Sequence, residues 1–251
     1  MAAARVMPDR VAQVQACLAT VMDPELDESV TELGFVTEIE VLEDGEVRIG
    51  FRLPTYWCAA NFAFLMADDM RVAVQSLPWV TRVDVRLHEH MYADAINLGV
   101  AQGRGFQASF GGAADGDLEG LRRTFMLKAF QRRQAALLQH LLDKGEPPGA
   151  LVAMDTATLQ CLPLDAEGEE LVERYLERRS MADGGDLAFV DTEGRAIAAD
   201  ALSGHLRDLR RVGVNAEFNG ALCRGLLSVR DAEAAPQPIH IVRRPLPAAT
   251  H

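Results

Sequence analysis

Hydrophobic positions in the first part of the chain repeat with a spacing typical of a helix. Over residues 8–22 they recur every three or four residues, which predicts an amphipathic helix. This helix should end near Asp23, because the proline that follows disfavours helical geometry at that residue. The apolar face consists of Val11, Val14, Leu18 and Val21.

The spacing then changes to strict alternation, which is typical of half-buried strands. Residues 36–53 alternate on both sides of Asp44-Gly45 and so predict a β-hairpin. Residues 58–76 are expected to form a helix, and residues 80–90 a third strand. The fold class expected is therefore α+β, with a helix-strand-strand-helix-strand domain whose helices cover a three-stranded sheet.

The second part of the chain is expected to be a mainly helical α+β region without internal repeats. The predicted domains are residues 1–98, a linker or mobile loop at 99–117, a C-terminal region at 118–234 and a flexible tail at 235–251. Helices are predicted at 118–143, 166–180 and 198–212. Strands or turns are predicted at 150–163, at a hairpin over 187–197, at Asn219-Gly220 and at a strand over 225–230.

Composition narrows the possible partners and locations. The 251 residues carry a formal net charge of -12, which disfavours nucleic acid as a partner. No apolar run reaches the length of about 18 residues that a membrane span needs, and the N-terminus lacks the apolar core of a signal peptide. A cytoplasmic protein without membrane contact is therefore expected. The four cysteines lie far apart, so neither a disulfide framework nor a closed four-cysteine zinc site is expected.

Cys58 is the first candidate for chemistry. It stands where the loop 54–57 meets the predicted helix, next to Tyr56 and Trp57. The backbone N–H groups at a helix N-terminus favour a thiolate, the form that binds metal or attacks an electrophile. The alternative is a packed cysteine with no chemical role.

Two further groups of residues could bind a cation. Residues 23–34 place several carboxylates in one loop, although the spacing of a calcium-binding loop is absent and a solvated acidic loop is the alternative. His88 and His90 would share the polar face of the third strand if strand geometry continued, and could then form half of an iron or zinc site. Ordinary surface histidines are the alternative.

Other chemistry finds little support in the sequence. Dinucleotide-binding, P-loop, nucleophile-elbow and paired-helix di-iron motifs are all absent. Cys161 and Cys223 lie in apolar contexts and are interpreted as core residues. No catalytic residue is assigned, and the protein is not expected to be an enzyme.

The motif Asp23-Pro24-Glu25, followed by Leu33-Gly34, a hairpin and a cysteine at a helix mouth, resembles a known family. These are the metal–sulfur cluster assembly factors, which include PaaD-like and SufT-like proteins. The resemblance covers residues 8 to 92. It implies that Cys58 is the reactive cysteine and that it contacts iron or an iron–sulfur cluster, which a factor of this family could hold transiently. Asp23 and Glu25 would form the acidic side of that site or set its loop, with His88 and His90 as additional ligands.

The chain departs from this family at the cysteine. The family has Ser/Thr-Pro-Gly-Cys-Pro, whereas this chain has Thr55-Tyr56-Trp57-Cys58-Ala59. Tyr56 and Trp57 could shield the thiol or form a docking surface for a client protein. The segment 88–134 is similar to an extended form of the family encoded beside binuclear-iron monooxygenases, which implies such a hydroxylase as the client.

The main hypothesis is thus an accessory maturation factor, or chaperone, that helps a client metalloenzyme acquire its metal centre. An iron–sulfur cluster or iron carrier is the first alternative, and a cysteine-nucleophile enzyme or a structural docking module are the others. A homodimer is also possible, because a three-stranded sheet leaves an open edge.

Overall fold

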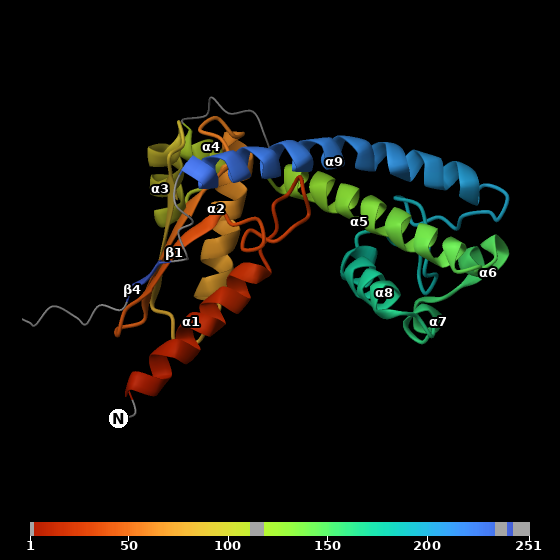
Figure 1. The fold of residues 1–251 in the computed structure, drawn as a ribbon, viewed down its shortest axis with the longest axis horizontal. Helices are drawn as coiled ribbons and strands as arrows, with labels where there is room; N and C mark the ends of the chain where they lie inside the picture. Colours follow the sequence, from red (N-terminus) through yellow and green to blue (C-terminus); the bar gives the residue numbers. More distant parts are fainter. Residues whose placement is uncertain (1–2, 111–117, 234–239, 243–251) are drawn as a thin grey trace, which may run out of the picture. The chain divides into compact units, whose positions relative to one another are not determined.

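The computed structural model describes residues 3–110, 118–233 and 240–242, which fall into two compact units (Figure 1). Unit 1 contains Met1–Gly120 together with Gly220–His251, and unit 2 contains Leu121–Asn219. The expected α+β class, with a three-stranded sheet in the N-terminal part and a mainly helical second part, is confirmed.

The sheet of unit 1 has the order β3-β2-β1-β4. The first two strands, β1 (Val36–Val41) and β2 (Glu46–Arg52), form the expected antiparallel hairpin. Gly45 closes it with a φ of +89°, and a side chain there would collide with the Trp79 carbonyl, so glycine is needed on both counts. The strand β3 (Arg82–His88) runs parallel to β2, because the helix between them crosses over the sheet.

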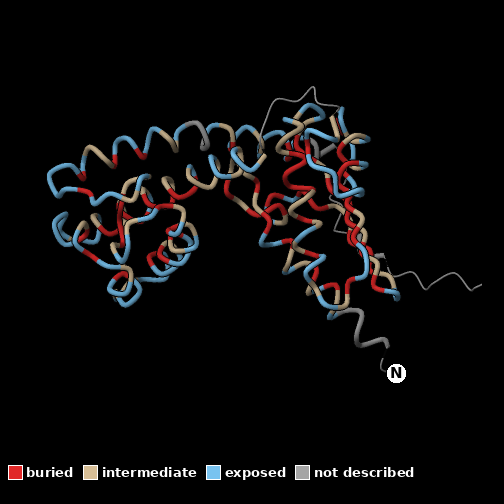
Figure 2. Tube along the Cα trace, turned by 180° about the vertical axis from the view of Figure 1, so that it is seen from behind, coloured by how far each residue is buried: buried red, intermediate tan, exposed pale blue. Residues whose placement is uncertain are grey.

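The helices of unit 1 pack against the apolar side of this sheet. They are α1 (Ala3–Ala19), α2 (Ala60–Gln75), α3 (Ala93–Ala101) and the short α4 (Phe106–Ser109). Buried segments are red in Figure 2. Burial alternates along β3 as the hydrophobic pattern predicts, whereas β1 and β2 each also contain three successive buried residues. Val11, Val14, Leu18 and Val21 are all buried, as expected, although α1 begins at Ala3 rather than at residue 8.

Unit 2 is helical and has its own hydrophobic core. Its helices are α5 (Leu118–Asp143), α6 (Pro148–Ala153), α7 (Thr156–Gln160) and α8 (Ala166–Arg179), joined by the first part of α9 (Leu202–Glu233). Asp155 and Asp165 cap α7 and α8 by accepting hydrogen bonds from backbone N–H groups. The side chain of Gln134 lies inside this unit and donates hydrogen bonds to the Tyr175 hydroxyl and the Val190 carbonyl.

Several element predictions for the second part of the chain are wrong. The expected strands at 150–163 are the helices α6 and α7, and the hairpin at 187–197 is reduced to an isolated bridge between Val190 and Ala196. The expected turn at Asn219-Gly220 and the strand at 225–230 lie inside α9. Part of the predicted linker 99–117 is helical, in α3 and α4, while residues 111–117 lie outside the described residues.

The end of the described chain returns to unit 1. Strand β4 (His240–Val242) pairs in parallel with β1, so the sheet has a fourth strand inside the predicted flexible tail, the rest of which lies outside the described residues. This strand covers the edge of β1 that a three-stranded sheet would leave open. Among the described helices, none combines the length and apolar character that crossing a bilayer requires.

Candidate functional site

The Cys58 thiol lies in the loop just before α2. The helix begins at Ala60 with Ala59 as its N-cap residue, two residues later than the predicted start at residue 58, so Cys58 lies outside the helix. Its Sγ lies 3.0 Å from the Thr55 hydroxyl oxygen, and its side chain packs against the core of unit 1 while remaining half-buried. The N-cap residue Ala59 makes no side-chain hydrogen bond to α2, whereas the Phe62 N–H in the first turn donates to the Asn61 side-chain oxygen at 2.9 Å.

His90 holds the backbone of Cys58 in place. Its Nε2–H donates to the Cys58 carbonyl at 2.8 Å, and its Nδ1 accepts from the Tyr92 N–H at 3.2 Å. These two partners require the neutral imidazole with the proton on Nε2. The ring is buried, with only 5 % exposed. Both ring nitrogens are therefore used in positioning the cysteine loop, and neither has a lone pair left for a metal.

His88 does not lie with His90. Strand geometry ends at His88, and Glu89 follows with a φ of +52°, which turns the next side chain inward. His88 remains exposed on the outer face of the sheet, where its ring lies over Gly50. The geometry expected for a two-histidine half-site, with both rings on one polar face, is absent.

Asp23 organises the acidic loop. Its Oδ1 accepts the N–H groups of Glu25 and Leu26 at 2.9 and 2.8 Å, and its own N–H donates to the Glu28 carbonyl. Burial raises the pKa of Asp23 above its usual value, which the two backbone hydrogen bonds partly oppose. The loop-setting role considered for Asp23 thus has a direct structural basis.

A second cysteine, which the sequence analysis placed in the core, adjoins this loop. Cys223 lies on α9 and is half-buried. Burial, followed by the negative charges of Cys58, Asp23 and Glu25, raises the pKa of its thiol to about 11, and Arg224 partly opposes this rise. The next residue, Arg224, donates a hydrogen bond to the Glu28 carboxylate at 2.6 Å, so this part of α9 lies against the loop that Asp23 organises. In the sequence Cys223 is separated from Cys58 by more than half of the chain, so spacing gave no signal for it.

Exposed aromatic side chains border the cysteine loop. Tyr56 is 55 % exposed and Trp57 is 71 % exposed, so neither ring buries the thiol. The Met91 N–H donates to the Tyr56 carbonyl at 3.0 Å, which brings the exposed Met91 and Tyr92 to the same part of the surface. We call these four residues the aromatic rim.

In the part of the chain that the structure describes, the candidate metal ligands do not form a complete binding group. Within the described ranges, no three or more His, Cys, Asp or Glu side chains are arranged to hold a metal ion. Cys58 could supply one soft sulfur donor, and any further ligands of a metal bound there would have to come from solvent or from a partner.

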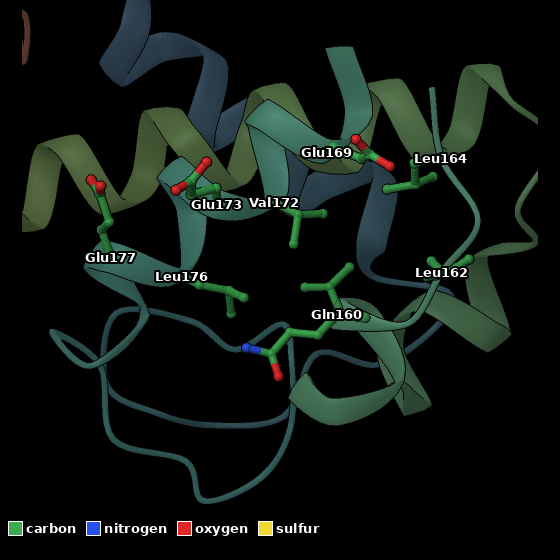
Figure 3. Close-up of a pocket in the computed structure, with 9 residues that line it drawn as sticks. Gln160, Leu162, Leu164, Glu169, Val172, Glu173, Leu176 and Glu177 are labelled. Atoms are coloured by element: carbon green, nitrogen blue, oxygen red, sulfur yellow. The ribbon is translucent and has the colours of Figure 1, made fainter. Parts of the chain in front are cut away.

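Unit 2 has a separate pocket of about 500 Å³ between α7 and α8 (Figure 3). Its floor is apolar and includes Leu162, Val172 and Leu176. Glu169 and Glu173 project from α8 beside this floor. The pocket therefore combines an apolar surface with an acidic border.

Comparisons with known proteins agree with the site in unit 1. The model of the iron–sulfur cluster assembly protein family matches residues 11–85, which include the Asp23 loop, the hairpin and Cys58. An uncharacterized protein from Methanocaldococcus jannaschii is 31% identical over 80 residues, which cover 32% of this chain and 82% of that protein. No solved structure is significantly similar to the chain. Through its N-terminal domain, the chain belongs to the iron–sulfur cluster assembly protein family.

Proposed function

We propose that this protein is a non-enzymatic accessory factor that helps a client metalloenzyme acquire its iron or iron–sulfur centre. The observation that carries the proposal is the Cys58 thiol, half-buried just before α2 within the family domain, which also contains the Asp23 loop. Iron or a cluster is the cargo in this proposal, and it is held transiently.

The residues around Cys58 have distinct roles in this proposal. The thiolate provides the soft donor for iron, and the N–H groups that begin α2 stabilise its negative charge. His90 fixes the loop through the Cys58 carbonyl, and Asp23 fixes the facing loop through its two backbone hydrogen bonds. Glu25 follows Asp23 in this loop and adds negative charge to it, which favours a cation.

We further propose a binuclear-iron monooxygenase hydroxylase as the client, and the cytoplasm as the place where the two meet. The support is the resemblance of the extended chain to proteins that accompany such enzymes. The aromatic rim supplies a docking surface next to the thiol, because aromatic residues and methionine are enriched where proteins meet. A homodimer formed through the β3 edge of the sheet is a further proposal.

The pocket of unit 2 is proposed as a second contact with the client. Its apolar floor and its glutamates complement a client segment that combines apolar side chains with arginine or lysine. Replacing Glu169 and Glu173 with lysine should weaken client binding, and the loss should be smaller at high salt. Replacing the exposed Glu170, which is not part of the pocket, is the matched control. If the pocket variant and the Glu170 variant bind the client equally well, the pocket is not a contact with the client.

The test is co-expression of a binuclear-iron hydroxylase with this protein, followed by iron content and soluble yield of the hydroxylase. Wild type should raise both quantities, and Cys58→Ala should not. Cys161→Ala is the control, because Cys161 is an exposed cysteine in unit 2. Equal performance of Cys58→Ala and wild type would make Cys58 structural, and no effect of wild type would exclude this client.

An iron or cluster carrier is the second candidate function. The family match over residues 11–85 favours it, and since one thiol per chain is too few for a cluster, further ligands would have to come from a second chain or another molecule. A carrier should retain iron in stoichiometric amount after reconstitution and purification, whereas a transient factor should lose it.

A further inference from the structure

The short helix α4 packs beside α3, and this packing requires glycine at position 99 (Figure 1). Gly99 is buried on α3, and a Cβ added there would collide with the Ser109 side chain and lie 3.0 Å from the Phe64 ring. Because Ser109 is the last residue of α4, a side chain at position 99 would displace this helix. The Ser109 hydroxyl donates to the Gly105 carbonyl at 2.9 Å, which closes the turn that α4 forms.

A continuous series of aromatic rings leads from the core of unit 1 through α4 to His90. The Phe64 and Phe106 rings meet edge to face with their centroids 5.6 Å apart, and the Phe110 centroid lies 4.7 Å from that of Phe106. Phe110 in turn meets the Tyr92 ring edge to face at 5.6 Å. The centroid of the His90 ring lies 6.1 Å from that of Tyr92. Aromatic pairs at these distances attract one another beyond the area they bury, so α4 holds the Tyr92 ring in place.

Tyr92 connects this series of rings to the cysteine loop through its backbone. Its N–H donates to Nδ1 of His90 at 3.2 Å, and Nε2 of His90 donates to the Cys58 carbonyl at 2.8 Å. Tyr92 is also the N-cap residue of α3, which Asn97 fastens to β3 by exchanging two hydrogen bonds with the Leu87 backbone, at 2.8 and 3.1 Å. The hold of α4 on Tyr92 therefore reaches the backbone of Cys58 through two hydrogen bonds.

We propose that Gly99 and Phe110 are positioning residues for the Cys58 thiol. They seat α4 so that Tyr92 and His90 keep the cysteine loop in place. This inference rests on the proposed function only in treating Cys58 as the working thiol, and it needs neither the client nor the cargo. Without the Phe110 ring, Tyr92 and His90 shift more freely and the loop opens more often. The rate at which a half-buried thiol is alkylated reports that opening.

The test is the rate of Cys58 alkylation by iodoacetamide in the full-length protein, read for each cysteine by mass spectrometry. Phe110→Ala should raise this rate by about fivefold or more, the change in a local opening equilibrium that one lost aromatic pair causes. Phe110→Leu keeps an apolar side chain there and should give a smaller rise. Gly99→Ala displaces α4 and should raise the rate as well. Leu98→Ala is the matched control, because Leu98 is exposed on the same helix, and it should react as wild type.

Two further measurements separate positioning from a general loss of structure, and circular dichroism checks that each variant is folded. Cys17 is also half-buried in unit 1, on α1, and should keep its wild-type rate. Because Phe110 acts through His90, adding Phe110→Ala to His90→Ala should cause little further acceleration. Equal acceleration of Cys17, or effects of the two substitutions that multiply, would overturn the inference. An unchanged Cys58 rate in the folded variants would overturn it too.

Failure of this inference and failure of the proposed function can be told apart, because alkylation is measured without a client. Faster alkylation of Cys58 in the variants supports the positioning role even if the hydroxylase matures equally well without the protein. In that case only the proposed client function fails. Unchanged alkylation, together with maturation that depends on Cys58, would remove the positioning role of α4 alone.

Discussion

At the residue scale, Cys58 is positioned by non-covalent contacts alone. A hydroxyl contacts its sulfur, an imidazole binds its carbonyl, and the first turn of a helix follows it. The side chain itself remains half-buried, so it is reachable. The loop geometry therefore depends on a few hydrogen bonds whose removal can be measured one at a time.

His90→Ala should destabilise unit 1 by about 1–3 kcal/mol, because it leaves the Cys58 carbonyl and the Tyr92 N–H without their buried partner. Denaturant unfolding measures this change, and alkylation of Cys58 should become faster as the loop loosens. His88→Ala is the control and should change stability by less than about 0.5 kcal/mol, because His88 is exposed. Equal effects of the two substitutions would contradict the positioning role of His90.

Asp23→Asn and Asp23→Ala should have different effects. Asparagine retains an oxygen that accepts the two loop N–H groups and removes a buried charge, so stability at neutral pH should be unchanged or higher. Alanine removes the acceptor and should cost about 1–3 kcal/mol. Because the pKa of Asp23 is raised in the folded protein, ionisation of its carboxyl group lowers the free energy of unfolding. The stability of wild type should therefore fall as the pH rises from the usual pKa of an aspartate through the raised value.

Thermal unfolding of both variants over a range of pH checks this prediction. The gain of Asp23→Asn over wild type should grow from acidic to neutral pH. If asparagine is as harmful as alanine, the charge of Asp23 is needed for the fold, and the loop-setting account is wrong.

At the element scale, the main feature is the packing of the end of α9 on unit 1. Leu227→Ala should cost about 2–3 kcal/mol, because it leaves a cavity in the core that α1, α2 and the sheet share. Leu226→Ala removes the same atoms from an exposed position and should cost far less. Hydrogen exchange should show faster opening of residues 220–233 in the first variant than in the second. Similar exchange in both would mean that Leu227 does not anchor the helix.

The elements of the N-terminal domain could be predicted because each carries a local signal. Alternation defines the three strands, Asp44-Gly45 defines the turn, and the family motif points to Cys58. The site is only partly local, since the imidazole that binds the Cys58 carbonyl comes from His90, which the sequence suggested as a metal ligand instead. Asn219-Gly220 suggests a turn by composition, yet the contacts of Gly220 and Leu227 with unit 1 keep the helix continuous there. The hydrophobic pattern of a single sequence does not show which distant segments such residues contact.

At the scale of the whole molecule, the two units have separate cores and should respond differently to pH. In unit 2 the Nε2–H of His205 donates to the Gln134 side chain at 2.6 Å. Burial lowers the pKa of His205 below its usual value of 6.5, although Asp191 and Asp208 partly oppose this. His205 therefore binds a proton more readily in the unfolded chain than in the folded one. Its contribution to the stability of unit 2 should be fully present above pH 6.5 and should be lost as the pH falls below that value.

Calorimetry from about pH 7.5 to about pH 5.5 tests this expectation. The transition of unit 2 should move to lower temperature over this range, and His205→Gln should remove much of the slope, because glutamine keeps a donor but does not titrate. An unchanged slope in His205→Gln would assign the pH dependence to other groups.

The return of the chain to unit 1 has a consequence for how the protein is made. During synthesis the family domain emerges first, but its fourth strand and the helix that carries Leu227 and Cys223 follow only after all of unit 2. Until then, the β1 edge and part of the core have no partner, and exposed strand edges favour association with other chains. A nascent chain should therefore be most prone to association with other chains in the interval before unit 2 and the segments after it have left the ribosome.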